Sequence, residues 1–360
     1  MDKPRLIYYN DAHHFHAKRI NPPLSIHQLQ WPVDEVMGTG VELLVLGLGY
    51  GDVYFHDSKV GRVVGEKKEV WDSIIDWRIM RMVKEASDMG TDQVKEIIKR
   101  GKQIGMPVFP SLKFQDNSPP ESERCGWLKW NYGADVCLGK GESEPWCYDF
   151  TNKLVLQDKI TIIKEMLDDY HADGIELDFM FRPRYFRSAD IESGTPLLTE
   201  FVAEIRELAN ETGERQGREI PILARVSYLR DDNLKVGMDV ETWIRNGSID
   251  MVVGQVREHL LDPCVVDARW MANAANAAGA AAYLRPPNLV YDERTSTPHI
   301  EMYRALGQTL HWQGFTGMYL GYLPWPLSTT EYQVLREVAY PESRPLPAVS
   351  RSRRCSPQPP

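Results

Sequence analysis

Eight short apolar runs alternate with stretches of helical periodicity along this chain. The runs are rich in Val, Ile, Leu, Tyr or Phe and are bounded by Gly, Pro or Asp, as is typical of buried parallel strands. They span residues 6–10, 42–48, 107–114, 174–181, 222–228, 249–255, 280–285 and 317–322. The run at 280–285 is the weakest, because its alanines could also end the alanine-rich helix that precedes it.

Helical signals fill most of the gaps between these runs. Apolar residues recur at helical spacing in 92–105 and 154–170, which predicts amphipathic helices. Further helices are expected at 196–210, 240–246, 266–278, 299–312 and 329–338, and residues 328–331 resemble a capping box. Eight strands, nearly all followed by a helix, predict an α/β fold of the (β/α)8 TIM-barrel type, which usually needs about 250 residues or more.

The 360 residues exceed that need, and the surplus lies in two long loops. These follow the second and third strands (49–76 and 115–151) and would lie on the C-terminal face, where such barrels build their sites. We expect one catalytic barrel domain over residues 1–342. Residues 343–360, rich in Pro, Ser and Arg, are expected to be a disordered tail.

Composition excludes several classes of partner. A net charge of −9 argues against a nucleic acid or an anionic membrane as the main partner. No apolar run reaches the roughly 18 residues of a membrane span, and the N-terminus lacks the apolar core of a secretory signal. We therefore expect a cytoplasmic protein with a small-molecule or oligosaccharide substrate and no cofactor, and leave its oligomeric state open.

Five cysteines do not make a disulfide scaffold, so Cys125, Cys137 and Cys147 are expected to be free thiols.

The fourth run carries two carboxylates, Glu176 and Asp178, within an apolar strand. Alternate residues of a strand share a face, so both should point one way while Ile175, Leu177 and Phe179 point the other. Burying an ionised carboxylate costs several kcal/mol unless it is paired. Paired carboxylates at the end of a barrel strand indicate acid–base or nucleophilic chemistry.

Polar residues also end the other strands, where a barrel places its chemistry. We expect them to bind the substrate. The set is Asn10, Asp11, His14, Lys113, Arg182, Arg225, Gln255, Arg285, Tyr319 and Trp325.

Three other interpretations stay open. Glu176 and Arg225 could form a core ion pair with no chemical role. A divalent metal could be held, as in a sugar isomerase, lyase or aldolase, by Asp11, His13, His16, Glu176, Asp178 and His259. The barrel could also bind carbohydrate without catalysis.

The segment Asp173-Gly174-Ile175-Glu176-Leu177-Asp178-Phe179-Met180 resembles strands of known glycosidases. It looks like the Asp-Gly-x-Asp-x-Asp-x-Glu strand of family-18 chitinases, with Met180 where that family has its catalytic acid. It is also similar to the strand of α-galactosidase-like barrels that carries the nucleophile. More broadly, the chain resembles glycoside hydrolase-like barrels of the family-10-like type.

This resemblance implies a glycoside hydrolase that uses two carboxyl groups. It assigns Asp178 as the nucleophile or base, with the acid supplied by another strand. Glu258, after the sixth strand, is the leading candidate for that acid, partly because α-galactosidase-like barrels place theirs there. Glu176 is expected to orient a substrate hydroxyl or Arg225. Glycoside hydrolysis needs such a pair flanking the scissile bond.

Overall fold

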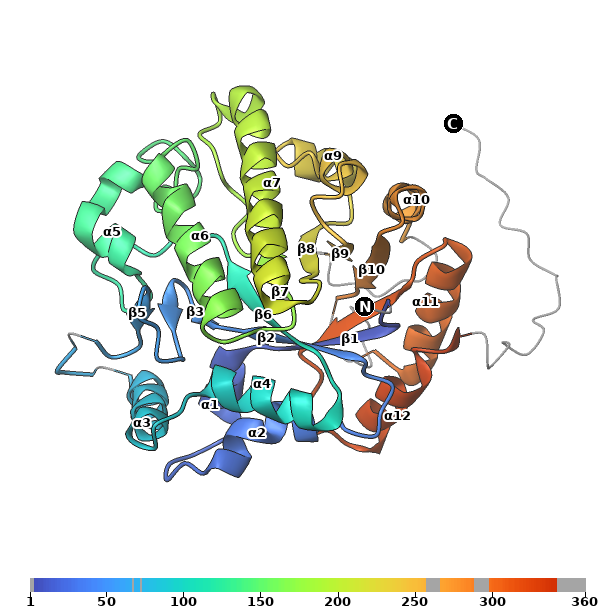
Figure 1. The fold of residues 1–360 in the computed structure, drawn as a ribbon, viewed down its shortest axis with the longest axis horizontal. Helices are drawn as coiled ribbons and strands as arrows, with labels where there is room; N and C mark the ends of the chain where they lie inside the picture. Colours follow the sequence, from blue (N-terminus) through green and yellow to red (C-terminus); the bar gives the residue numbers. More distant parts are fainter. Residues whose placement is uncertain (1–2, 67, 72, 257–265, 288–297, 342–360) are drawn as a thin grey trace, which may run out of the picture.

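Eight parallel strands close into a barrel in the computed structural model, which describes residues 3–66, 68–71, 73–256, 266–287 and 298–341. Helices surround the strands (Figure 1). Around the barrel the order is β1, β11, β10, β9, β8, β7, β6, β2. The bounds are β1 Leu6–Asn10, β2 Leu43–Gly47, β6 Val108–Lys113, β7 Ile175–Asp178, β8 Ile222–Ser227, β9 Met251–Gln255, β10 Ala281–Arg285 and β11 Gly317–Gly321. The predicted (β/α)8 barrel is therefore confirmed, including its weakest strand.

Alternate residues of the strands form two separate apolar layers. One fills the barrel interior and includes Ile7, Tyr9 and Tyr319. The other lies between strands and helices, and it contains Ile175 and Leu177 of β7. Because neighbouring residues of a strand face opposite sides, Glu176 and Asp178 point into the barrel interior. The expected separation of the two carboxylates from the apolar face is confirmed.

Most expected helices begin and end within three residues of the predicted positions. They are α4 (Gln93–Ile104), α6 (Lys153–Asp168), α9 (Val240–Arg245), α10 (Arg269–Ala278), α11 (Ile300–Trp312) and α12 (Thr329–Glu337). The capping box before α12 is present: the backbone N–H of Ser328 donates to Glu331 (2.7 Å), and that of Thr330 donates to Ser328 Oγ (3.2 Å).

Helix α7 (Ile191–Gln216) is longer at both ends than predicted. We expected it to begin at Pro196, with Thr195 opening the helix. Instead Pro196 lies in the second turn, where its missing N–H leaves the exposed Glu192 carbonyl to water. The hydroxyl of Thr195 donates to the Ile191 carbonyl (2.9 Å), so Thr195 belongs to the helix and does not cap it.

Further helices and a small sheet lie in the segments between the barrel strands and were not predicted. Helices α1 (Ala12–Lys18), α2 (Ile26–Asp34), α3 (Ile74–Asp88), α5 (Trp127–Tyr132) and α8 (Arg230–Leu234), the 3₁₀ turn η1 (Gly133–Val136) and a small sheet of β3 (Gly49–Tyr50), β4 (Val53–Tyr54) and β5 (Arg62–Val63) belong to this group. The small sheet occupies the long loop after β2, and α5 and η1 occupy the loop after β6. The expected disordered tail lies outside the described residues.

Buried lysines fasten both long loops to α6. The Lys159 ammonium of α6 donates to Asp52 Oδ1 in the loop after β2 (3.1 Å). Lys129, in the loop after β6, donates to the Asp116 carbonyl of the same loop (2.7 Å), and its Nζ lies 3.8 Å from Asp52 Oδ2. Both ammonium groups are fully buried and lie over the Tyr148 ring, 4.4 and 4.5 Å from its centroid. Three segments distant in sequence are thus joined through one charged cluster.

Cys125, Cys137 and Cys147 are buried free thiols in this loop region, as expected. Burial raises the pKa of Cys125 to about 12 and that of Cys137 to about 11. These thiols are therefore protonated and unreactive at neutral pH.

Replacing Lys159 with methionine should lower the free energy of unfolding by about 3 kcal/mol, because it leaves Asp52 buried beside Asp158 with one cation fewer. Urea denaturation followed by circular dichroism measures this change. Lys164→Met, at an exposed position of the same helix, is the control and should change stability by less than about 0.5 kcal/mol. Equal effects of the two substitutions would contradict the proposed fastening role.

Candidate active site

Inward-facing residues of five adjacent strands converge at the C-terminal end of the barrel. In the strand register, Asp178 of β7 lies beside Arg225 of β8 and beside Lys113 of β6. Ser227 of β8 pairs with Gln255 of β9, which pairs in turn with Arg285 of β10. The sequence-predicted residues of these five strands therefore share one end of the barrel.

Arg225 bridges the two carboxylates of β7. Its Nε donates to Glu176 Oε1 (2.6 Å), and one terminal nitrogen donates to Asp178 Oδ2 (2.5 Å). The other terminal nitrogen donates to Gln255 Oε1 (3.2 Å), and the guanidinium carbon lies 4.9 Å from the centroid of the Tyr9 ring. All nitrogens of this guanidinium are engaged, and both carboxylates are buried. The expected Glu176–Arg225 pair is present and includes Asp178.

Glu176 lies deeper in the barrel than Asp178. Its second oxygen accepts a hydrogen bond from the Tyr319 hydroxyl (2.7 Å). Burial raises the pKa of Glu176 above its ordinary value, although the positive charge of Arg225 opposes this shift. The hydrogen bonds from Arg225 and Tyr319 occupy both carboxylate oxygens of Glu176.

Asp178 is held from two sides. Oδ1 accepts hydrogen bonds from the backbone N–H groups of Met180 (2.9 Å) and Phe181 (3.2 Å), as in an Asx turn. Oδ2 accepts the bond from Arg225. A carboxylate offers about four lone-pair sites, so three are occupied and one remains available.

A third carboxylate, Asp11, lies between β1 and α1. It caps α1 by accepting the His13 backbone N–H at Oδ1 (2.9 Å). Its Oδ2 accepts a hydrogen bond from the Tyr322 hydroxyl (2.6 Å) and lies 3.4 Å from Lys113 Nζ. Burial favours the neutral acid, but Lys113 and Tyr322 outweigh it and hold the pKa of Asp11 well below its usual range. Asp11 is therefore an anion paired with the cation at the end of β6.

The histidines near Asp11 differ in their surroundings. His13 lies against the Tyr50 ring, with 5.2 Å between ring centroids, and burial lowers its pKa to about 4. The half-exposed His14 meets the edge of Tyr322 (4.9 Å between centroids). His16 is fully buried, and its Nδ1 lies 2.9 Å from the Ala12 carbonyl oxygen. His13 and His16 are thus uncharged at neutral pH.

The structure does not gather the metal-ligand set proposed from the sequence. Within the described ranges, no group of three or more His, Cys, Asp or Glu could hold a metal ion. Arg225 already occupies the space between Glu176 and Asp178, and His16 packs on Phe55 away from them. His259 lies outside the described residues.

Three predicted substrate-binding residues are also separated from the carboxylate pair. Asn10 shares a strand face with the helix-side residues of β1, and with Trp325 it interacts with Glu35. Arg182 is exposed on the rim in a left-handed conformation (φ 55°) and pairs with Glu144 (3.4 Å). Glu258, the candidate acid, lies outside the described residues.

Two tyrosines belong to the site and were absent from the predicted set. Tyr9 and Tyr322 both contact Asp11, and Tyr9 also lies under Arg225. The strand pattern held a signal for Tyr9, because alternation in residues 6–10 places it on the inward face with Ile7. Tyr322 ends the last predicted run (317–322), although it was not included in the predicted substrate-binding set, and in the structure it follows β11 at positive φ (56°).

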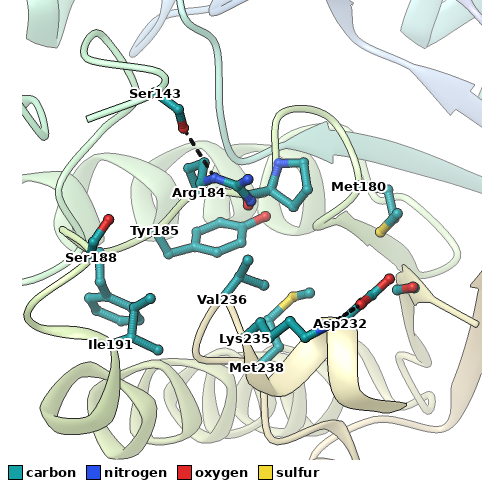
Figure 2. A pocket seen from close by; sticks show the side chains of 13 residues that line it. Ser143, Met180, Arg184, Tyr185, Ser188, Ile191, Asp232, Lys235, Val236 and Met238 are labelled. Atoms are coloured by element: carbon teal, nitrogen blue, oxygen red, sulfur yellow. Dashed lines mark hydrogen bonds and ion pairs between the residues drawn. The ribbon is translucent and has the colours of Figure 1, made fainter. Parts of the chain in front are cut away.

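A cavity of about 430 Å³ adjoins this site on the β7–β8 side (Figure 2). Its walls come from the loop after β7, from α7 and from the α8 region, with Met180 at one end and Lys235 paired to Asp232 at the rim. Neither the carboxylate pair nor Arg225 lines it.

The chain folds as a closed (β/α)8 barrel with polar residues gathered at one end. No family model matches the sequence, and no curated protein matches it. In the part of the chain that the structure describes, no helix combines the length and apolar character needed to span a membrane.

Solved structures share this fold at low sequence identity. The glycoside hydrolase domain of PgaB (BpsB) from Bordetella bronchiseptica is 12% identical, with 96% of this chain and 99% of that chain covered and a TM-score of 0.57. The endo-1,4-β-D-mannanase of Thermotoga petrophila is 11% identical (94% and 99% covered, TM-score 0.57). A family-18 N-acetylglucosaminidase from Paenibacillus barengoltzii is 10% identical (93% and 100% covered, TM-score 0.50). At these identities the likeness establishes the fold alone.

Replacing Arg225 with methionine should lower the free energy of unfolding at pH 7 by about 3 to 5 kcal/mol, because two buried carboxylates lose their cation. Without that cation, the folded-state pKa of Glu176 rises further above the unfolded value. A carboxyl group with a raised folded-state pKa stabilises the fold at low pH and loses that contribution as pH rises. The variant should therefore gain stability as pH falls from about 7 towards about 5.

Urea denaturation at several pH values measures this dependence. Arg245→Met removes the same charge from an exposed site at the end of α9 and should leave stability and its pH dependence unchanged. If Arg225→Met behaved like this control, Arg225 would not neutralise the carboxylates.

Proposed function

We propose that this protein is a glycoside hydrolase that acts on an oligosaccharide or glycoside at the C-terminal face of the barrel. The observation that carries the proposal is the placement of Asp178. It ends a barrel strand, faces the interior, and is oriented by Arg225 and two backbone N–H groups. Catalytic groups held in one geometry by surrounding hydrogen bonds avoid reorganisation during the reaction.

In the proposed mechanism Asp178 is the nucleophile or the base. Through the lone-pair site left on its carboxylate, Asp178 would attack the anomeric carbon to form a glycosyl ester that water then hydrolyses. As a base, it would instead take a proton from the water that attacks this carbon. Glu258 would protonate the leaving oxygen. Glu176 would hold Arg225 and Tyr319 in place without touching the scissile bond. Lys113, Gln255, Tyr319 and His14 are proposed to contact sugar hydroxyls, with Asp11 orienting Lys113.

A non-catalytic carbohydrate-binding barrel is the second candidate. One observation favours it: each oxygen of Asp178 and of Glu176 already accepts a hydrogen bond from the protein. In that case the cluster would serve as a core ion pair, and sugar would bind without turnover. The two candidates differ in whether the bound sugar is hydrolysed or is released unchanged.

Asp178→Asn tests the first candidate. It keeps the shape of the side chain but removes the charge, so kcat on a glycoside found by screening should fall by about 10³-fold, equivalent to about 4 kcal/mol in the barrier. Asp88→Asn, at an exposed position that ends α3, should keep full activity. Circular dichroism establishes that both variants fold. Undiminished turnover by Asp178→Asn would remove this residue from the mechanism.

Glu258→Gln tests the assignment of the acid. Leaving groups of high pKa need a proton in the transition state, whereas a nitrophenolate leaves without one. The variant should therefore lose about 10²-fold or more in kcat on natural linkages but much less on aryl glycosides. The ratio of kcat for the two substrate types, compared with that of the unmodified protein, is the measurement. An equal loss on both would assign Glu258 a different role.

A further inference from the structure

Arg285 ends β10 at the barrel mouth beside the cluster of Arg225. It pairs in register with Gln255, whose side chain accepts a hydrogen bond from Arg225. Its guanidinium carbon lies 5.3 Å from the centroid of the Tyr322 ring. Arg285 therefore lies beside both the Arg225 cluster and the Tyr322 ring.

The guanidinium of Arg285 lacks the partners that the other cations at the mouth possess. Arg225 is bonded to Glu176, Asp178 and Gln255, and Lys113 lies beside Asp11. Across the described ranges, Arg285 makes no ion pair, and its buried Nε has no hydrogen-bond partner. Among the described residues, Arg285 therefore differs from both neighbouring cations, because no carboxylate pairs with it and its Nε has no acceptor.

Electrostatics at this position are unfavourable in the absence of a ligand. Burial lowers the pKa of Arg285 below the usual arginine value, and the positive charge of Arg225 lowers it further. The Arg285 residue is partly exposed, but its Nε is buried without an acceptor, and a bound anion would supply one. Arginine presents a planar fork of N–H donors that matches a carboxylate or phosphate in a bidentate arrangement, and stacking on an aromatic ring suits such a fork.

We propose that Arg285 binds an anionic group, a carboxylate or a phosphate, carried by the sugar that enters the barrel mouth. The inference rests on the proposed function for its sugar, while the anion preference rests on the geometry of Arg285. The anion would lie over the Tyr322 side of the mouth, next to Arg225. The substrate class is then a glycoside of a uronic acid or of a sugar phosphate.

Isothermal titration calorimetry with D-glucuronate, D-glucose 6-phosphate and D-glucose tests the proposal. One of the two anions should bind at least about tenfold more tightly than glucose, a difference of about 1.4 kcal/mol. The better anion identifies the charged group. Its affinity should fall as NaCl is raised from about 0.05 to about 0.5 M, whereas the affinity for glucose should not.

Variants separate Arg285 from the rest of the positive charge. Arg285→Gln should abolish the anion preference, and Arg285→Lys should retain part of it because a charge remains. Arg245→Gln removes one exposed arginine at the end of α9 and should change nothing. Thermal unfolding of each variant establishes that it folds, and the salt dependence of the unmodified protein provides a test that needs no variant.

The outcomes distinguish this inference from the proposed function. Equal binding of glucose and both anions, no binding of any of the three, or an unchanged preference in Arg285→Gln would overturn it. Hydrolysis of neutral glycosides without anion preference would leave the hydrolase proposal standing and remove this one. Arg285-dependent anion binding without hydrolysis of any glycoside would support this inference and overturn the hydrolase proposal.

Discussion

Arg225 is the residue on which the rest of the barrel mouth depends. Two carboxylates two residues apart on β7 point into a space closed by tyrosines, where neither could stay charged without a cation. Arginine suits this position, because its rigid fork reaches Glu176 and Asp178 at once. The register of β7 and β8 sets Arg225 beside Asp178, so the hydrogen bonds of the sheet position this charge cluster.

The strands were predictable because parallel barrel strands are buried on both faces. Their apolar runs therefore stand out from the amphipathic helices, and the eight predicted runs correspond to the eight strands of the barrel. The inward direction of Glu176 and Asp178 also followed from the sequence, because the apolar residues between them had to face the helices. The order of the strands and the alternation of inward and outward residues thus suffice to predict which residues meet at the C-terminal end of the barrel. They are Lys113, Arg225, Gln255 and Arg285.

Other features depend on contacts that a local pattern does not contain. The two-residue strands β3 to β5 have no periodicity of their own and form only where the loops meet. Asn10 ends a strand, but its position in the strand alternation places it on the helix side of the barrel. There both Asn10 and Trp325 interact with Glu35. Proline in the second turn of α7 is tolerated because the carbonyl that it leaves unpaired is exposed to water.

The backbone hold on Asp178 has an evolutionary consequence. Oδ1 is bound by the N–H groups of Met180 and Phe181, and any residue other than proline supplies such a group. The side chain at position 180 can therefore change over time while the orientation of Asp178 is inherited. A strand with glutamate at that position and this strand with methionine can share the same turn.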